Sequence, residues 1–556
     1  MTASQLLAES LGRYWTALSP HSLQRSPYLS FAELSAWGII SILSLLLVAA
    51  LIVRAYVQFV YRPLRLIRHF KKQGMKGPPF KLLVGQMSVL KDSEKVVENG
   101  GKNMQYMMDW KKEYGSIFYY CIGPKVRLAI LDPALLHQVL HTTTGNGGHY
   151  RKNDYGAEVF EPVLGKHGLV FASNAIWSRQ RKLVNPMFSH SKLKDMEPFI
   201  VSSTEEMVRR WEAKIDGAGG RAEIEVNQEL STVARDVICR AVFGQEDGAE
   251  SAYSGQDIYH DFENLLKDIA ARSFGPQAMF IPFYKYLPIP INVRIARTRA
   301  RVRAMILSLI NNRRAKAAVA AKANGGPPDF GDDLLGSLLA ASDEQGSLSS
   351  EELIDQCKTF FFAGHETSGH ALTWTLLLLG QHPEWQERAR AEVREHCGSA
   401  PPNKDSANKL KVVTMVLRET MRLFPPVPFT TRQVSKPQQL GPYAIPQDDN
   451  LVIAVPIYPL HRDPATWGAD ADVFNPERFE NGPAGAATDA RAYIPFASGP
   501  RNCVGQQLAM LETKMVLAMV LQRFRFSVAP GYRHWPHNTI TLRPKLGLPL
   551  LVEKVE

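Results

Sequence analysis

Near its C-terminus the chain reads Phe496-Ala-Ser-Gly-Pro-Arg-Asn-Cys-Val-Gly505, a loop rich in glycine and proline that leads into a predicted helix at 505–523. Cys503 stands directly before that helix, where amide groups and the helix dipole stabilise a thiolate. Gly499 allows a tight turn, and Arg501 supplies a fixed cation. A buried structural cysteine is the alternative, but it would not require these partners at these spacings. The stretch therefore predicts that Cys503 ligates a haem iron as a thiolate, with Phe496 and Arg501 beside the haem.

Three further patterns lie upstream of this loop. Glu419-Thr-Met-Arg422 places opposite charges on one helix face, Pro476-Glu-Arg478-Phe adds an arginine, and Trp177-Ser-Arg-Gln-Arg181 offers an indole N–H and a guanidinium. With the cysteine loop, these patterns resemble the cytochrome P450 family. The resemblance implies the P450 fold and a haem b cofactor. It also implies a structural charge triad of Glu419, Arg422 and Arg478, and contacts to the haem propionates from Trp177, Arg181 and Arg432.

A long helix is predicted from a capping box at Ser349 and Glu352 to about Gln381. Its centre reads Ala363-Gly-His-Glu-Thr367 and resembles the oxygen-activating A-G-x-[D/E]-T of the family. We expect Gly364 to leave room for dioxygen. The Thr367 hydroxyl is expected to bridge to the Ala363 carbonyl and to donate towards bound oxygen, while Glu366 passes protons inward.

Other chemistries fit the same helix less well. His365-Glu366 followed by His370 invites comparison with the zinc hydrolase motif H-E-x-x-H, but that motif needs histidines four residues apart. His370 is five residues on, about 140° around the helix from its counterpart. A reductase-independent isomerase or dehydratase of the P450 fold, or a haem-binding sensor, would not need the acid–threonine pair. Glu366 and Thr367 therefore favour monooxygenation.

Composition sets the broad class. The chain has 556 residues, 45% of them hydrophobic, which is enough for a large core and excludes a disordered protein. Its five cysteines include no C-x-x-C pair, which argues against a disulfide scaffold or a structural zinc site. Helical patterns dominate 92–422, and proline-rich, strand-like sequence fills 425–500. We predict a mainly α fold with a minor β part.

The segment 34–53 is 20 residues long and carries no charge, so as a helix it spans about 30 Å, the thickness of a bilayer core. A signal peptide would be shorter and nearer the N-terminus. Basic residues cluster after this segment, which predicts a single-pass anchor with the catalytic part in the cytosol. These residues are Arg54, Arg62, Arg65, Arg68, Lys71, Lys72 and Lys76.

We accordingly expect four parts: a lumenal segment at 1–33, the anchor at 34–53, a basic and Pro/Gly-rich hinge at 54–79 that ends in Gly77-Pro78-Pro79, and a haem-thiolate monooxygenase domain at 80–556. The net charge of +11 is mild, and its concentration beside the anchor indicates contact with anionic lipid and no nucleic-acid partner. The resemblance places the protein in the endoplasmic reticulum membrane.

No segment fits a nicotinamide or flavin site, because Gly145-Asn-Gly-Gly has no suitable βα context. Electrons must come from a partner, and the resemblance implies NADPH–cytochrome P450 reductase, with cytochrome b5 as an optional second donor. The candidate docking cations are Arg179, Lys182, Lys192 and Lys194, for which a solvated face is the plainer interpretation.

The substrate is expected to be a hydrophobic small molecule. Stretches such as His382-Pro-Glu-Trp-Gln-Glu-Arg-Ala389 resemble a plant subgroup that hydroxylates brassinosteroids, cytokinins, gibberellins and other terpenoids or hormones. By family position, the substrate pocket is expected to draw on Tyr150–Leu169, Ala363, Val427–Thr431 and Leu546–Leu548.

Overall fold

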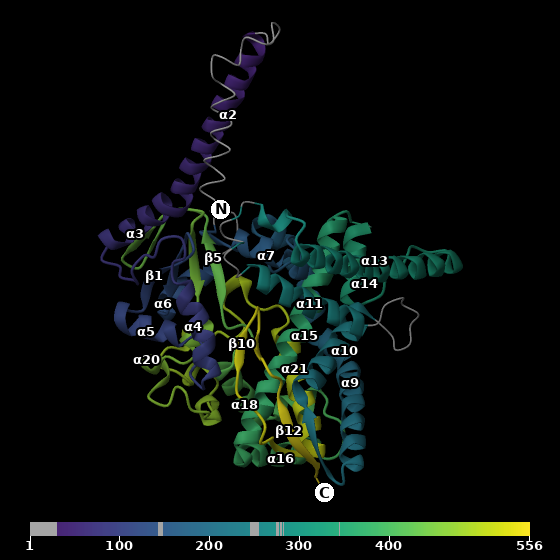
Figure 1. Cartoon of the computed structure of the whole chain (residues 1–556). Coiled ribbons are helices and arrows are strands. Elements are labelled where there is room, and N and C mark those ends of the chain that lie inside the picture. The colour runs from purple at the N-terminus through teal and green to yellow at the C-terminus, as the bar shows by residue number, and fades with distance from the viewer. Residues whose placement is uncertain are drawn as a thin grey trace, which may run out of the picture. The chain divides into compact units, whose positions relative to one another are not determined.

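The structure is a computed structural model that describes residues 31–142, 148–244, 255–273, 277, 281, 283–343 and 345–555. The chain divides into two compact units, Met1–Leu64 and Arg65–Glu556. The fold is mainly helical with a minor β part, which confirms the predicted class (Figure 1). Most of the predicted lumenal segment, 1–33, lies outside the described residues.

The N-terminal helix continues further than the sequence predicts. Helix α2 (Phe31–Tyr56) is followed without a break by a π-helical turn, η2 (Val57–Tyr61), and by α3 (Arg62–Lys72). The Arg62 N–H donates to the carbonyl of Val57, five residues back. Because Pro63 has no N–H to donate, this wider turn lets the helix pass the proline. The predicted hinge at 54–79 is therefore helical up to Lys72.

One helix among the described residues, Trp37–Lys72, is long and apolar enough to cross a membrane, and the mean hydropathy of its most apolar 18-residue stretch is 2.5. None of that stretch is buried against protein. An apolar surface of this size needs a lipid or protein partner, and it coincides with the predicted anchor.

The end of α3 belongs to the second unit. Arg65 forms an ion pair with Asp448. His69 Nε2 lies 2.8 Å from the carbonyl oxygen of Ala444, and Gln73 Nε2 donates to the same oxygen at 3.1 Å. The second unit therefore begins earlier than the predicted boundary at residue 80, because these polar contacts hold 65–73 on it.

The helices of the second unit cover most of its sequence. The α-helices are α4 (Met87–Glu98), α5 (Gln105–Tyr114), α6 (Pro133–His141), α7 (Asp154–Leu164), α8 (Asn174–Val184), α9 (His190–Gly217), α10 (Val226–Phe243), α11 (Gly255–Ser273), α13 (Pro290–Asn324), α14 (Leu334–Asp343), α15 (Ser350–Gln381), α16 (Pro383–Cys397), α17 (Lys404–Lys409), α18 (Lys411–Leu423), α19 (Ile457–Leu460), α20 (Pro464–Trp467) and α21 (Gln506–Arg523). Short 3₁₀ turns are η3 (Asn185–Phe188), η4 (Tyr284–Tyr286), η5 (Pro476–Phe479), η6 (Pro483–Gly485), η7 (Ala490–Ala492) and η8 (Gly499–Arg501).

The strands form one larger sheet, in the order β1-β2-β8-β5-β3, a three-stranded sheet in the order β4-β12-β9, and two hairpins, β6-β7 and β10-β11. Within the larger sheet β2 and β8 are parallel, with Val126 opposite Leu451. The strands are β1 (Ile117–Ile122), β2 (Lys125–Ile130), β3 (Tyr150–Arg151), β4 (Arg221–Glu225), β5 (Thr430–Val434), β6 (Gln438–Leu440), β7 (Tyr443–Ile445), β8 (Leu451–Val455), β9 (Phe524–Val528), β10 (Pro536–Asn538), β11 (Leu542–Pro544) and β12 (Pro549–Lys554).

Helix α15 is the central element of the second unit. The Ser349–Glu352 capping box is present at its start, as predicted. Most of its side chains are buried, and it packs against α10, α18 and α21 (Figure 1). Trp374 stacks on Phe424 with ring centres 4.5 Å apart. Because α15 is buried on nearly every face, its Ala363–Thr367 segment lies inside the fold.

Candidate functional site: a cysteine loop, a cluster of cations and a polar helix segment

The loop before α21 is held by backbone geometry. Ala497 and Gly499 both have positive φ, at 58° and 73°. A Cβ on Gly499 would lie 2.5 Å from the carbonyl oxygen of Leu140 on α6, so only glycine fits this close approach. The Cys503 N–H donates to the carbonyl of Phe496 at 2.9 Å. Together these features fix Cys503 one turn ahead of α21.

The Cys503 thiol lies in a recess. Its side chain is exposed to solvent. Burial nevertheless raises the pKa of the thiol, while the Gly505 N–H and the charge of Arg181 lower it. A group that solvent reaches but that atoms surround closely lines a hollow and not the outer surface. The two pKa-lowering groups are those that stabilise a thiolate ligand.

Arginines from three elements surround this recess. Arg181 of α8 donates to the backbone oxygen of Asn502 at 2.8 Å and to its side-chain oxygen at 3.0 Å. Arg501 stacks over the Trp177 ring at 4.6 Å and donates to the carbonyl of Leu169 at 3.4 Å. Arg432 on β5 donates to the carbonyl of Thr431 at 2.9 Å.

Two of these cations keep buried donors without a partner among the described residues, namely Nε of Arg432 and Nε of Arg501. Burial lowers the pKa of Arg432 to about 10. Burial, with the charges of Arg432 and Arg181, lowers the pKa of Arg501 to about 9. Cations that crowd one another with orphaned donors need an anionic ligand.

Lys152 is a further member of this cluster that the sequence did not single out. Burial and the charges of Arg432 and Arg501 lower its pKa well below the ordinary range. Its only sequence signal was its place in the predicted pocket segment, Tyr150–Leu169. The cations and the recessed thiol fit a haem with its two carboxylates: Cys503 would hold the iron, and Lys152, Arg181, Arg432, Arg501 and Trp177 the propionates.

The polar segment of α15 shows the predicted threonine contact. Thr367 Oγ1 donates to the carbonyl of Ala363 at 2.7 Å. Gly364 has a packing reason in addition to the predicted one, because a Cβ there would lie 2.0 Å from Cγ1 of Ile238 on α10. That Gly364 leaves room for dioxygen stays a prediction.

Glu366 faces away from solvent, towards the loop before β11. Thr541 Oγ1 donates to Glu366 Oε2 at 2.6 Å, and Nδ1 of His370 lies 3.6 Å from the same oxygen. Burial raises the pKa of Glu366, but the charges of His370 and His365 and the Thr541 hydrogen bond outweigh it, so the net shift is downward. His370 follows Glu366 by four residues, a spacing that places two side chains on one helix face, whereas no local pattern indicated Thr541 as a partner of this carboxylate.

The arrangement does not suit zinc. Nδ1 of His365 lies 2.7 Å from the carbonyl of Phe361, whereas His370 lies beside Glu366. Among the described residues no group of three or more His, Cys, Asp or Glu side chains could hold a metal ion.

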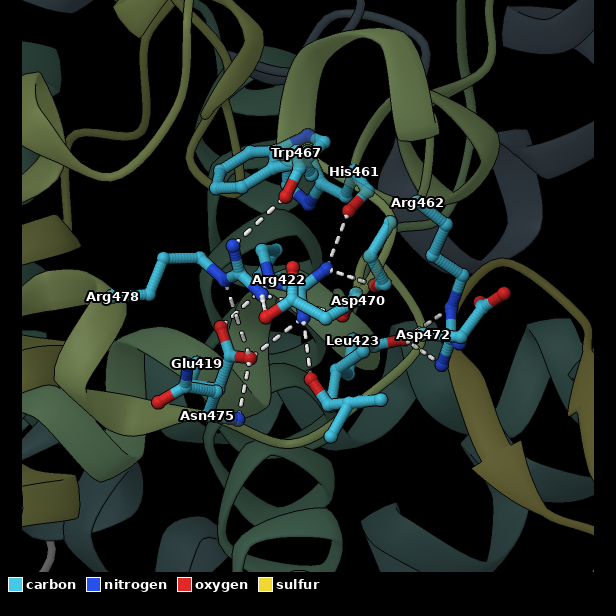
Figure 2. Close-up of polar contacts among 12 residues, drawn as sticks. Glu419, Arg422, Leu423, His461, Arg462, Trp467, Asp470, Asp472, Asn475 and Arg478 are labelled. Atoms are coloured by element: carbon cyan, nitrogen blue, oxygen red, sulfur yellow. Dashed lines mark hydrogen bonds and ion pairs between the residues drawn. The ribbon is translucent and has the colours of Figure 1, made fainter.

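The structure brings the predicted charge triad together (Figure 2). Glu419 and Arg422 have fully buried side chains joined by two hydrogen bonds of 2.6 Å. Arg422 also donates to the carbonyls of His461 at 2.9 Å and Val473 at 3.1 Å. Nε of Arg478 lies 3.8 Å from Glu419. The triad thus joins α18 to the loop around η5 and does not border Cys503 in these contacts, which favours the structural role.

Of the four cations predicted to dock a reductase, two lie beside acidic side chains and two are exposed to solvent. Arg179 forms an ion pair with Glu352, and Lys192 lies 3.7 Å from Asp332. Lys182 and Lys194 are exposed. Exposed lysines are therefore the better candidates for a partner's acidic face.

The site's geometry agrees with what this chain is similar to. The sequence model described as Cytochrome P450 matches residues 75–550. The chain belongs to the cytochrome P450 family. It is 34% identical to Cytochrome P450 709B1 of Arabidopsis thaliana, over 93% of this chain and 98% of that protein.

Other P450 relatives are equally similar. Cytochrome P450 CYP72A616 of Paris polyphylla is 35% identical over 91% of this chain and 97% of its own. Secologanin synthase 2 of Catharanthus roseus is 34% identical over 89% of this chain and 93% of its own. The predicted resemblance to plant P450s is confirmed.

As a member of this family, the protein is a haem-dependent monooxygenase, an oxidoreductase whose haem is bound through a cysteine thiolate. P450s typically take electrons from a redox partner and act on hydrophobic substrates.

Proposed function

We propose that this P450 hydroxylates a hydrophobic small molecule of the steroid, terpenoid or hormone-like kind, using O₂ and electrons that NADPH–cytochrome P450 reductase delivers. One observation supports it most strongly: the Cys503 thiol lies near a cluster of cations, two of which, Arg432 and Arg501, keep a buried Nε without a partner in the described chain. A haem, when bound there, supplies one-electron transfer and oxygen activation.

The residues of α15 would serve the proton steps. The Thr367 hydroxyl donates its hydrogen bond to the Ala363 carbonyl and keeps two lone pairs free to accept. Because the hydroxyl can rotate, it could donate instead to a ligand beside the helix. Neighbouring residues on a helix point about 100° apart, so Glu366 and Thr367 do not face one another. A proton held at Glu366 Oε2 would therefore reach Thr367 through a water or after Glu366 leaves Thr541.

The partner and the membrane complete the proposal. Lys182 of α8 and exposed Lys194 of α9 would meet an acidic face of the reductase, and cytochrome b5 would use the same face. Basic residues follow the apolar helix and acidic ones are absent from 54–76, so the catalytic unit would lie on the cytosolic side of the membrane. The likeness to plant P450s supports the endoplasmic reticulum as that membrane.

Reconstitution tests this function. The purified holoenzyme, reductase and NADPH are incubated with sterols, diterpenoids and adenine-type hormones, and products are identified by mass spectrometry with ¹⁸O₂. The proposal predicts one labelled oxygen atom in the product and no turnover without reductase. Product formed without O₂ or NADPH would contradict it.

A further inference from the structure

Arg127 on β2 is a cation without an acidic partner in the described part of the chain. It pairs in register with Tyr120 of β1 and Val452 of β8. Its guanidinium lies 6.0 Å from the centre of the Phe429 ring. Its Nε is buried and has no hydrogen-bond partner. Arg127 is half-buried, and its guanidinium donates to the phenol oxygen of Tyr120, a neutral partner. A partly buried guanidinium that no carboxylate neutralises can bind an anion.

Arg272, in the last turn of α11, is a second cation of this kind. Burial lowers its pKa, and only the phenols of Tyr155 and Tyr284 act in the opposite direction. The described residues offer it no carboxylate.

Arginines on the neighbouring helix α13, unlike Arg127 and Arg272, form ion pairs with carboxylates. These pairs are Arg294 with Asp268 at 2.8 Å, Arg299 with Glu161 at 2.8 Å, and Arg301 with Asp261 at 2.5 Å. Paired and unpaired arginines therefore lie on adjacent elements of one unit, since α11 packs against both α13 and α7.

Tyr155, on the first turn of α7, is close enough to both Arg127 and Arg272 for their charges to act on its phenol. Burial raises the pKa of its phenol, while the charges of Arg127 and Arg272 both oppose that rise. The side chain is nevertheless 46% exposed, so it lines a space that solvent reaches. The one carboxylate whose charge also acts on the Tyr155 phenol, that of Glu158, forms an ion pair with Lys285 at 3.4 Å. The space beside Tyr155 therefore carries excess positive charge.

This pair is separate from the cations assigned to the haem. The charges of Arg432 and Arg501 lower the pKa of Lys152, and that of Arg432 lowers the pKa of Arg501, whereas neither Arg127 nor Arg272 contributes to either shift. The two sets are nonetheless neighbours, because Phe429, under Arg127, directly precedes β5, which carries Arg432. A molecule that extends from the haem site past Phe429 would bring its far end to Arg127.

We propose that Arg127 and Arg272 form an anion subsite beside Tyr155, and that the substrate is a hydrophobic molecule with a carboxylate. The proposal rests on the proposed function and narrows its substrate class. Guanidinium groups bind carboxylates through paired, charge-assisted hydrogen bonds, and the Tyr155 hydroxyl adds a third donor. The carboxylate would fix which carbon of the apolar skeleton faces the haem.

Binding of matched acids and esters tests the subsite. The full-length holoenzyme in neutral detergent is titrated with fatty, diterpenoid and steroid carboxylic acids and with the methyl ester of each. Binding is followed by the Soret shift and by calorimetry, which does not depend on the haem spectrum. We expect at least one acid to bind about tenfold or more tightly than its ester, a difference typical of one charge-assisted contact.

Variants assign the preference to residues. Arg127→Gln and Arg272→Gln should each weaken binding of that acid about tenfold and leave binding of its ester within about twofold. Arg299→Gln, which removes an arginine already paired with Glu161, is the matched control and should change neither. Each variant must retain the haem spectrum and the unfolding temperature of the wild type.

Two results would overturn the anion subsite. One is equal binding of acid and ester in every pair. The other is a loss of acid and ester binding together in the glutamine variants. Nanodiscs of phosphatidylcholine with and without phosphatidylglycerol separate a lipid headgroup from a substrate. If the arginines change only association with phosphatidylglycerol, the substrate proposal fails. In all three cases an intact haem-thiolate spectrum leaves the proposed function standing.

Discussion

At the scale of single residues, hydrogen bonds that look alike in the structure differ in what surrounds them. Thr367 and Thr375 lie on α15 and each donates at 2.7 Å to the carbonyl four residues back. Thr375 is fully buried, whereas Thr367 lies in the part-buried segment with Ala363 and Gly364. Only the Thr367 hydroxyl can exchange its carbonyl for a ligand, because only it borders accessible space.

Thr367→Ala should keep the haem and the CO spectrum but divert reducing equivalents to peroxide, with coupled product falling about tenfold or more, as for loss of a proton-transfer group. Peroxide and product are measured against NADPH consumed. Thr375→Ala removes the same kind of hydrogen bond and should leave coupling unchanged. Equal coupling in the wild type and in Thr367→Ala would remove Thr367 from the mechanism.

At the scale of elements, α15 is held by close contacts on two sides. Gly364 lets Ile238 of α10 approach, and Glu512 of α21 is buried against Ser368. Neither contact is visible in the motif, because A-G-x-[D/E]-T does not say which neighbour each residue faces.

Gly364→Ala should destabilise the protein by about 1–3 kcal/mol, since the new methyl group would overlap Ile238. In the Ile238→Ala background, where the side chain no longer fills this space, Gly364→Ala should cost less than it does in the wild type. Thermal unfolding of the wild type, both single variants and the double variant measures the coupling. Purely additive effects would show that the two side chains do not meet.

Burial raises the pKa of Glu512 to about 8, so this carboxyl is protonated in the folded protein at neutral pH. The unfolded chain ionises near its ordinary value of about 4.5, so between that pH and about 8 the native state binds the extra proton and its stability falls as pH rises. Glu512→Gln should remove this contribution.

The unfolding temperature of Glu512→Gln should therefore exceed that of the wild type by a few degrees at pH 8, with a smaller or reversed difference at pH 5. Differential scanning fluorimetry across this range measures it. A difference that does not vary with pH would mean that Glu512 is ionised in the fold.

The sequence predicted those features that depend on local pattern. The capping box of α15, the helix after Cys503 and the Thr367–Ala363 bond each follow from residues within one or two turns. The Thr541 partner of Glu366 could not be predicted, because it lies 175 positions away and reaches Glu366 only through the packing of the β10–β11 hairpin. The same holds for Lys152, Arg127 and Arg272.

At the scale of the whole molecule, the described residues include one helix long and apolar enough to cross a membrane and one large compact unit, Arg65–Glu556. The unit boundary falls after Leu64, beyond the apolar stretch, and Arg65 begins the contacts of the second unit. The predicted break at Gly77-Pro78-Pro79 lies beyond the end of α3 at Lys72, and a π-helical turn carries the preceding helix past Pro63.

Deleting residues 2–64 should release most of the protein from membranes while keeping the haem spectrum, because the second unit retains its own core. Carbonate extraction and sedimentation of the truncated and full-length proteins measure the release. A truncated protein that stays wholly in the membrane fraction would show that the apolar helix is not the main tether.

The account as a whole depends on the bond between Cys503 and iron. The most direct test is the difference spectrum of the reduced, CO-bound full-length protein, compared between the wild type, Cys503→Ala and the control Cys397→Ala, which changes a half-buried free cysteine. The account predicts the red-shifted Soret band of thiolate ligation in the wild type and in Cys397→Ala, and its loss in Cys503→Ala. A red-shifted band that survives in Cys503→Ala would contradict it.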